Sequence, residues 1–148
     1  MKLPEYISID EVKRVCRELG IRDWSALKEP GVQPEEATKI LSEVNITNMP
    51  VALDDFRTGL EVELEHGVVF PEFNVTNNHP IVTGMIVMAH FMESLDYYQR
   101  LDVAEIEGDM AKAAAAGNAD KLLSKYRALV RAKLDLAQVE ERVVSRPD

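Results

Sequence analysis

The sequence predicts an all-α fold: a five-helix, bundle-like domain with a duplicated N-terminal helical unit and a long C-terminal antiparallel helical hairpin. Apolar residues recur at helical spacing along most of the chain, and no segment alternates convincingly with the period of two that is typical of strands. Helix start and stop signals separate these apolar segments. The 148 residues leave room for one domain. We expect it to have three parts: a duplicated short-helix unit (1–50), a core helix-loop-helix (51–105) and the C-terminal hairpin (106–148).

The first two helices are expected to be copies of one short unit. Ser8 and Glu11 form an S-x-x-E capping box at the start of the first helix, and Gly20 supplies the left-handed residue that ends it. The same pattern recurs 25 residues later, where Pro34 takes the first helical position and Asn45 replaces the glycine. Two copies are too few for a solenoid, so we interpret this region as a duplicated helical unit.

The third and fourth helices are expected on either side of a loop. The third covers residues 51–66 and stops at Gly67, and its core stripe comprises Leu53, Phe56, Leu60 and Leu64. A loop follows over residues 67–79, and the fourth helix begins at Pro80. The apolar face expected for this fourth helix comprises Ile81, Met85, Ala89 and Met92.

Helical character continues from Pro80 to residue 116, where Gly117 and Asn118 provide a stop followed by a cap. A straight helix of that length would span roughly 55 Å, whereas a compact domain of this size is about 38 Å across. The helix must therefore kink, with Gly108 as the expected place, or project as an arm against the fifth helix. Residues at helical spacing mark the fifth helix: Leu123, Tyr126, Val130, Leu134 and Ala137. An arm with apolar faces favours a homo-oligomer or a protein partner docked on the hairpin, and a kinked monomer is the alternative.

Composition excludes several functions. The chain has 17 Lys+Arg and 26 Asp+Glu, a net charge of −9, so neither nucleic acid nor a membrane surface is expected as a partner. Its longest apolar segment, residues 81–92, is too short and too polar to span a bilayer. The single cysteine, Cys16, is expected to be a small buried apolar residue. No apolar segment follows the lysine in MKLPEYISID, so we expect no signal peptide and a cytoplasmic location.

Two recurring motifs are interpreted as structural. Residues 45–47 and 74–76, Asn-Ile-Thr and Asn-Val-Thr, match the glycosylation sequon, which matters only in a secreted chain. Each motif lies just ahead of a proline, Pro50 or Pro80, and so indicates an Asx or ST turn that leads into a helix. There is no glycine-rich phosphate loop, so no nucleotide cofactor is expected.

Two segments carry a dense cluster of potential metal ligands. Glu61, Glu65 and His66 lie near the end of the third helix, and the two glutamates are one turn apart, off the leucine stripe. His90 and Glu93 lie one turn apart on a stripe of the fourth helix that we expect to be covered. An antiparallel arrangement would bring both groups together. Carboxylate and imidazole ligands without thiolate favour iron, manganese or zinc, so the sequence predicts a transition-metal site with no assigned reaction.

Other interpretations of these residues stay open. Glu61 and Arg57 have the spacing of an ordinary surface pair, His66 can cap the last carbonyls of its helix, and His90 can be a hydrogen-bonded core histidine. The protein would then be a non-catalytic interaction or oligomerisation module whose Glu/His cluster is a structural polar core. A hydrolase with His90 and Glu93 as acid and base is a third alternative, although no nucleophile or oxyanion motif accompanies them.

A family resemblance involves the same residues. Its motifs are FRTGLEVELEHG at 56–67, NVTN at 74–77, Pro80, TG at 83–84, AH at 89–90, Glu93 and DYYQRL at 96–101. They resemble small prokaryotic proteins grouped as domain of unknown function 5661, and the LGIRDWS segment at 19–25 is similar to that family's lead-in. The resemblance covers about residues 7–105 and implies no reaction. It implies that Glu65, His66, His90 and Glu93 belong to the family motif.

Overall fold

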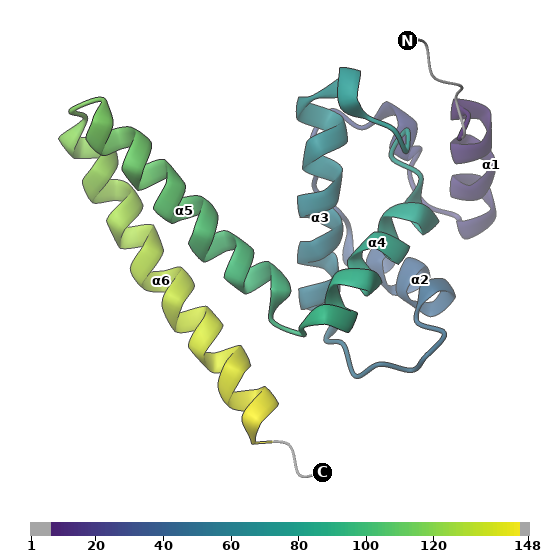
Figure 1. The fold of residues 1–148 in the computed structure, drawn as a ribbon. Coiled ribbons are helices and arrows are strands. Elements are labelled where there is room, and N and C mark those ends of the chain that lie inside the picture. Colours follow the sequence, from purple (N-terminus) through teal and green to yellow (C-terminus); the bar gives the residue numbers. More distant parts are fainter. Residues whose placement is uncertain (1–6, 146–148) are drawn as a thin grey trace. The chain divides into compact units, whose positions relative to one another are not determined.

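The computed structural model describes residues 7–145, and within them it contains six α-helices, two short 3-10 helices and no strand (Figure 1). The all-α prediction is therefore confirmed, with six helices instead of five. The helices are α1 (Ile9–Leu19), α2 (Pro34–Val44), α3 (Leu53–Val69), α4 (Pro80–Glu93), α5 (Tyr97–Ala115) and α6 (Ala119–Val144), with 3-10 turns η1 (Trp24–Ala26) and η2 (Pro71–Phe73). The chain divides into two compact units, one running up to Met92 and the other beginning at Glu93. The sequence instead predicts one domain, in which the three parts meet after residues 50 and 105.

The helices α1 and α2 are equivalent elements. Each has 11 residues, and their first residues, Ile9 and Pro34, are separated by the expected offset. Ser8 accepts a hydrogen bond from the backbone N–H of Glu11, and Gly20 ends α1 with a φ of +61°. Asn45, in contrast, has a φ of −82°, so the left-handed cap predicted there is wrong.

The side chain of Asn45 closes the chain after α2 in another way. It accepts a hydrogen bond from Met49 N (2.8 Å) and donates one to Met49 O (2.9 Å). Asn74 similarly accepts from Asn78 N at 3.3 Å. These two bonds span four residues and not the two of an Asx turn, whereas the bond from Asn78 N to Thr76 Oγ1 (3.2 Å) forms the predicted ST turn in the second motif. The left-handed conformations fall three residues after each of these asparagines, at Asn48 (φ 51°) and Asn77 (φ 49°).

The helix α3 runs past its predicted stop, because Gly67 lies inside it. A Cβ at this position would lie 2.9 Å from the side-chain Cγ of Asn74, and it would also collide with Asn78. The glycine therefore allows the loop to pack closely against the helix instead of ending it.

The buried face of α4 is not the predicted one. Met85 and Met92 of the predicted face are exposed, and the core side of α4 comprises Thr83, Gly84, Val87, Met88 and Phe91. A Cβ on Gly84 would lie 2.7 Å from Ile40 Cγ2, so this glycine allows α4 to approach α2 closely. Both faces of α4 are rich in apolar residues, and the size of residue 84 decides which face packs.

The long predicted helix is interrupted at residues 94–96, and Gly108 lies within an unbroken α5. The predicted kink at Gly108 is therefore wrong, because one exposed glycine costs a helix only about 1 kcal/mol. The interruption is stabilised by side-chain bonds. Asp96 accepts hydrogen bonds from Ser94 and, at 2.6 Å, from Arg100.

The helices α5 and α6 pack side by side as a hairpin (Figure 1). Gly117 has a φ of +63° at the end of α5, and Asn118 accepts a hydrogen bond from Lys121 N, so the predicted stop and cap are confirmed. The packed centre comprises Val103, Ile106, Met110, Ala128, Leu129 and Ala132. The residues whose spacing predicts this helix lie on the exposed face of α6: Leu123, Tyr126, Val130, Leu134 and Ala137. Within the described residues, no helix has both the length and the apolar character of a bilayer span.

Candidate functional site

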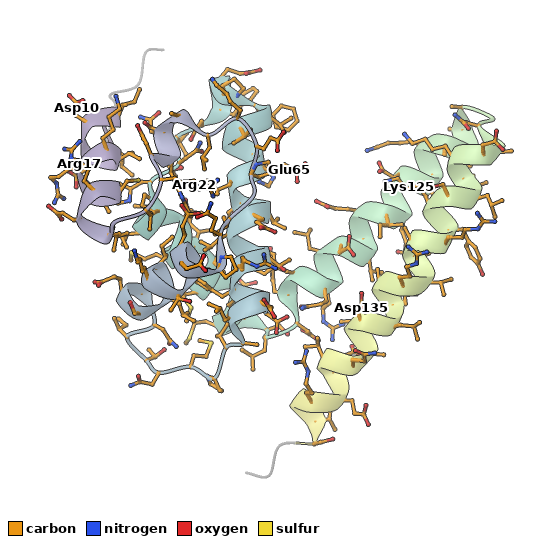
Figure 2. All side chains as sticks on the ribbon, turned by 180° about the vertical axis from the view of Figure 1, so that it is seen from behind. Asp10, Arg17, Arg22, Glu65, Lys125 and Asp135 are labelled. Atoms are coloured by element: carbon orange, nitrogen blue, oxygen red, sulfur yellow. The ribbon has the colours of Figure 1, made fainter. Side chains whose placement is uncertain are left out.

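The structure places the five predicted metal ligands on two helices without gathering them. Glu65 (labelled in Figure 2), His66 and Glu93 are exposed, whereas Glu61 and His90 are partly buried. Among residues 7–145, no group of three or more His, Cys, Asp or Glu side chains is positioned to hold a metal ion. The metal site therefore stays a prediction, and the contacts of each residue decide what it can contribute.

The partner of His90 is Glu63, a residue that the sequence analysis did not select. Its Oε1 lies 3.4 Å from His90 Nε2, and the two side chains are only 18% and 26% exposed. The pair joins α3 to α4 inside the N-terminal unit. The sequence did contain a signal for Glu63, because it follows Phe56 by seven residues and so shares the core-facing stripe of α3.

Glu61 has a structural contact instead. Its Oε1 accepts a hydrogen bond from the backbone N–H of Val32 at 3.0 Å. The bond ties the segment before α2 to the side of α3. Arg57 has the spacing of a surface partner for Glu61, but it pairs with Asp54: its Nη2 lies 3.8 Å from Asp54 Oδ1.

A cavity of about 140 Å³ lies next to the Glu63–His90 pair. Its lining comprises Glu63, His66, Gly67, Phe73, Asn74, Val75, Thr76, Thr83 and Ile86. Glu63 and His66, which lie about one turn apart on α3, therefore border the same cavity. The cavity is smaller than the 300 Å³ or more typical of organic-ligand sites, so its volume suits an ion with a few waters.

The third histidine caps a helix. His79 is buried, and its Nδ1 accepts a hydrogen bond from Val82 N at 3.3 Å, at the start of α4. Burial lowers the pKa of His79, while the negative charge of Glu11 opposes that shift. His79 is therefore neutral when it caps α4, because a protonated Nδ1 cannot accept a hydrogen bond.

Glu36, whose side chain is only 3% exposed, forms an ion pair with the more exposed Arg22 (labelled in Figure 2). Arg22 donates two hydrogen bonds to the carboxylate, at 2.9 and 2.6 Å, and a third to Gly31 O at 2.7 Å. Burial raises the pKa of Glu36, but the bonds from Arg22 and from the backbone of Gln33 outweigh it and lower the pKa overall. These contacts close the loop between α1 and α2, which is a structural role.

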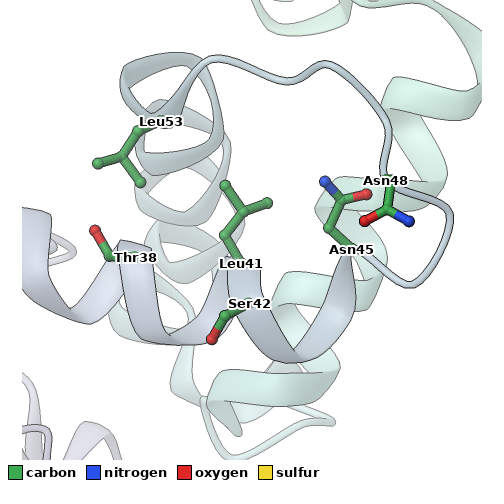
Figure 3. A pocket seen from close by; sticks show the side chains of 6 residues that line it. All are labelled: Thr38, Leu41, Ser42, Asn45, Asn48 and Leu53. Carbon is green, nitrogen blue, oxygen red and sulfur yellow. The ribbon is translucent and has the colours of Figure 1, made fainter.

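A larger hollow of about 370 Å³ lies along α2 and the start of α3 (Figure 3). Its lining comprises Thr38, Leu41, Ser42, Asn45, Asn48 and Leu53. The hydroxyls of Thr38 and Ser42 donate to carbonyls of their own helix, and Asn45 is bonded to Met49. The lining contains no ionisable side chain, so it offers no group for general acid–base chemistry.

The exposed face of α6 carries a row of apolar side chains, which we call the α6 ridge: Leu123, Tyr126, Val130, Leu134, Ala137 and Val144. The four large residues at its centre, Leu123, Tyr126, Val130 and Leu134, are 50%, 54%, 45% and 60% exposed. The opposite face of α6 packs on α5, and Leu129, Ala132 and Val139 are buried there. The ridge therefore lies outside the packed centre of the hairpin.

Comparison with known protein families gives a match over the N-terminal two thirds of the chain. The family model described as "Protein of unknown function (DUF5661)" matches residues 12–107, more than half of the chain. No curated protein and no solved structure matches the chain. The match ends inside α5 and leaves the whole of α6 outside it.

Proposed function

Because the chain belongs to the DUF5661 family of proteins of unknown function, we propose a function from its own geometry: a protein-interaction module that presents the α6 ridge to a protein partner. The exposure of the ridge is the observation that carries this proposal. Single apolar residues on a surface are ordinary, but a continuous row of them marks a docking surface. The row here has the helical spacing by which one helix packs on another.

The hairpin itself supports this assignment. Ion pairs along its edge join α5 to α6: Lys125 to Asp109 (2.7 Å), Lys133 to Glu107 (3.1 Å) and Arg100 to Glu140 (2.6 Å). These ion pairs and the packed centre hold α6 on α5, and none of them involves a ridge residue. Substitutions on the ridge should therefore change the free energy of unfolding by only about 0.5 kcal/mol or less.

Site-specific photo-crosslinking tests the proposal. A benzoylphenylalanine at position 126, on the ridge, is expected to form a discrete adduct with another polypeptide in cells of the encoding organism. The matched control is position 121, which is also exposed on α6 but lies off the ridge. If position 126 yields no more adduct than position 121, the ridge is not a docking surface.

The Glu63–His90 pair supports a second candidate, a transition-metal site for iron, manganese or zinc. The pair joins a carboxylate to an imidazole, and His66 borders the cavity beside it. Elemental analysis of protein purified without a histidine tag tests this candidate. We expect about one equivalent of metal, lost in His90→Ala and Glu63→Gln and kept in the control Glu43→Gln, an exposed residue of α2 outside the predicted ligands. Less than about a tenth of an equivalent in the unaltered protein would reject it.

A further inference from the structure

We propose that the α6 ridge binds the α6 ridge of a second copy of this chain, with the two helices antiparallel about a two-fold axis near Leu134. This inference rests on the proposed function, because it uses the same ridge and adds the identity of the partner. Two-fold pairing is the commonest way in which identical chains associate. The order of apolar and charged residues along α6 supports this arrangement.

The apolar residues of the ridge are spaced for a long contact between helices. Leu123, Val130, Ala137 and Val144 recur every seven residues, and Leu134 lies beside them. Such a repeat keeps one continuous seam on a helix. In an antiparallel pair centred near Leu134, Leu123 of one copy meets Val144 of the other. Val130 likewise meets Ala137, a large residue against a small one, and symmetry makes each contact twice.

Charged residues beside the ridge follow the same symmetry. Arg127 lies in the N-terminal half of α6, three residues before Val130, and Glu141 lies in its C-terminal half, three residues before Val144. Antiparallel pairing places Arg127 of one copy opposite Glu141 of the other. Parallel pairing would bring like charges together instead. Charge complementarity therefore selects the antiparallel arrangement.

Both charged side chains are exposed, and none of the ion pairs found among residues 7–145 involves them. Two other charged residues of α6, Lys133 and Glu140, are bonded to α5 within the hairpin. Arg127 and Glu141 instead flank the ridge, with opposite charges in the two halves of the helix, as a symmetric partner requires.

Charge reversal in the full chain tests the pairing. Arg127→Glu and Glu141→Arg each place like charges opposite one another in a homodimer, at two symmetric positions. Each variant alone is expected to weaken self-association by at least about tenfold. In an equimolar mixture, the glutamate at 127 of one variant faces the arginine at 141 of the other, and the second pair is the native one. The mixture should therefore dimerise where neither variant does.

Sedimentation velocity measures these states, and circular dichroism verifies that each variant is folded. The exposed control Lys121→Glu should dimerise like the unaltered chain. An unaltered chain that is monomeric up to about 100 µM overturns the inference. So does a dimer that tolerates both single reversals, or a mixture that stays monomeric.

The crosslinker at position 126 separates the two proposals. An adduct joined to the C-terminal part of a second α6 supports both of them. An adduct with a different protein overturns self-pairing and leaves the docking function standing. No adduct above the control at position 121 overturns both.

Discussion

Glu11 and Glu36 occupy equivalent positions of the duplicated helices and have different surroundings. Glu11 is exposed and pairs with Arg14, whereas Glu36 is buried and held by Arg22. Arg22→Ala would leave a buried carboxylate without its partner, so we expect a loss of about 3 kcal/mol in the free energy of unfolding. Urea denaturation at neutral pH measures this loss.

Arg14→Ala is the matched control, because Arg14 is a surface residue and should have little effect. Equal losses in the two variants would contradict a special role for the buried pair. The lowered pKa of Glu36 also sets the pH dependence. Its contribution is complete above the ordinary glutamate pKa of 4.5 and is lost as the pH falls through the lower pKa of the folded state.

His79 predicts a second pH dependence, nearer to neutrality. The pKa of His79 is lowered from its ordinary value of 6.5, so the unfolded chain takes up a proton first as the pH falls. The unaltered protein should therefore lose stability from about pH 7 towards pH 5. In His79→Asn this slope should be smaller, because asparagine caps helices well and does not titrate. Urea denaturation across that range compares the two proteins, and equal slopes would assign the pH dependence to other groups.

At the scale of the helices, alanine substitutions at two glycines should have opposite effects on stability. Gly84→Ala would force a Cβ to within 2.7 Å of Ile40, so we expect a loss of about 1–3 kcal/mol from overpacking. Gly108 lies inside α5 with no atom within 4 Å of the added Cβ. Gly108→Ala should therefore stabilise the helix by up to about 1 kcal/mol. Thermal unfolding of both variants checks these signs, and two changes of the same sign would contradict the assignment.

Local signals predicted some helix ends correctly but did not predict which face of α4 is buried. The first-turn proline of α2 and the stop at Gly117 are confirmed because such signals act within a few residues. The buried face of α4 was predicted incorrectly, since both faces are apolar and Gly84 settles the choice only against α2. Glu63 was not predicted as a site residue, because its partner His90 belongs to another helix. Periodicity within one helix cannot identify partners across helices.

At the scale of the whole molecule, the division near residue 92 predicts where substitutions act. Arg22→Ala and Gly84→Ala should lower the protection of amides in α1–α4, whereas Gly108→Ala should raise it in α5 and α6. Hydrogen exchange followed by mass spectrometry resolves the two groups of helices. A change that spreads equally over both groups would show that the two units unfold as one.

The burial of Cys16 supplies a probe of these motions. This single thiol is buried in α1, and Trp24 donates its backbone N–H to the sulfur at 3.5 Å. Burial raises the pKa of the Cys16 thiol, so little reactive thiolate is present while α1 stays packed. A disulfide reagent should therefore react only as fast as the surrounding helices separate. Because the chain has a single thiol, the rate at which a chromogenic disulfide reagent reacts measures how often the helices around Cys16 open transiently.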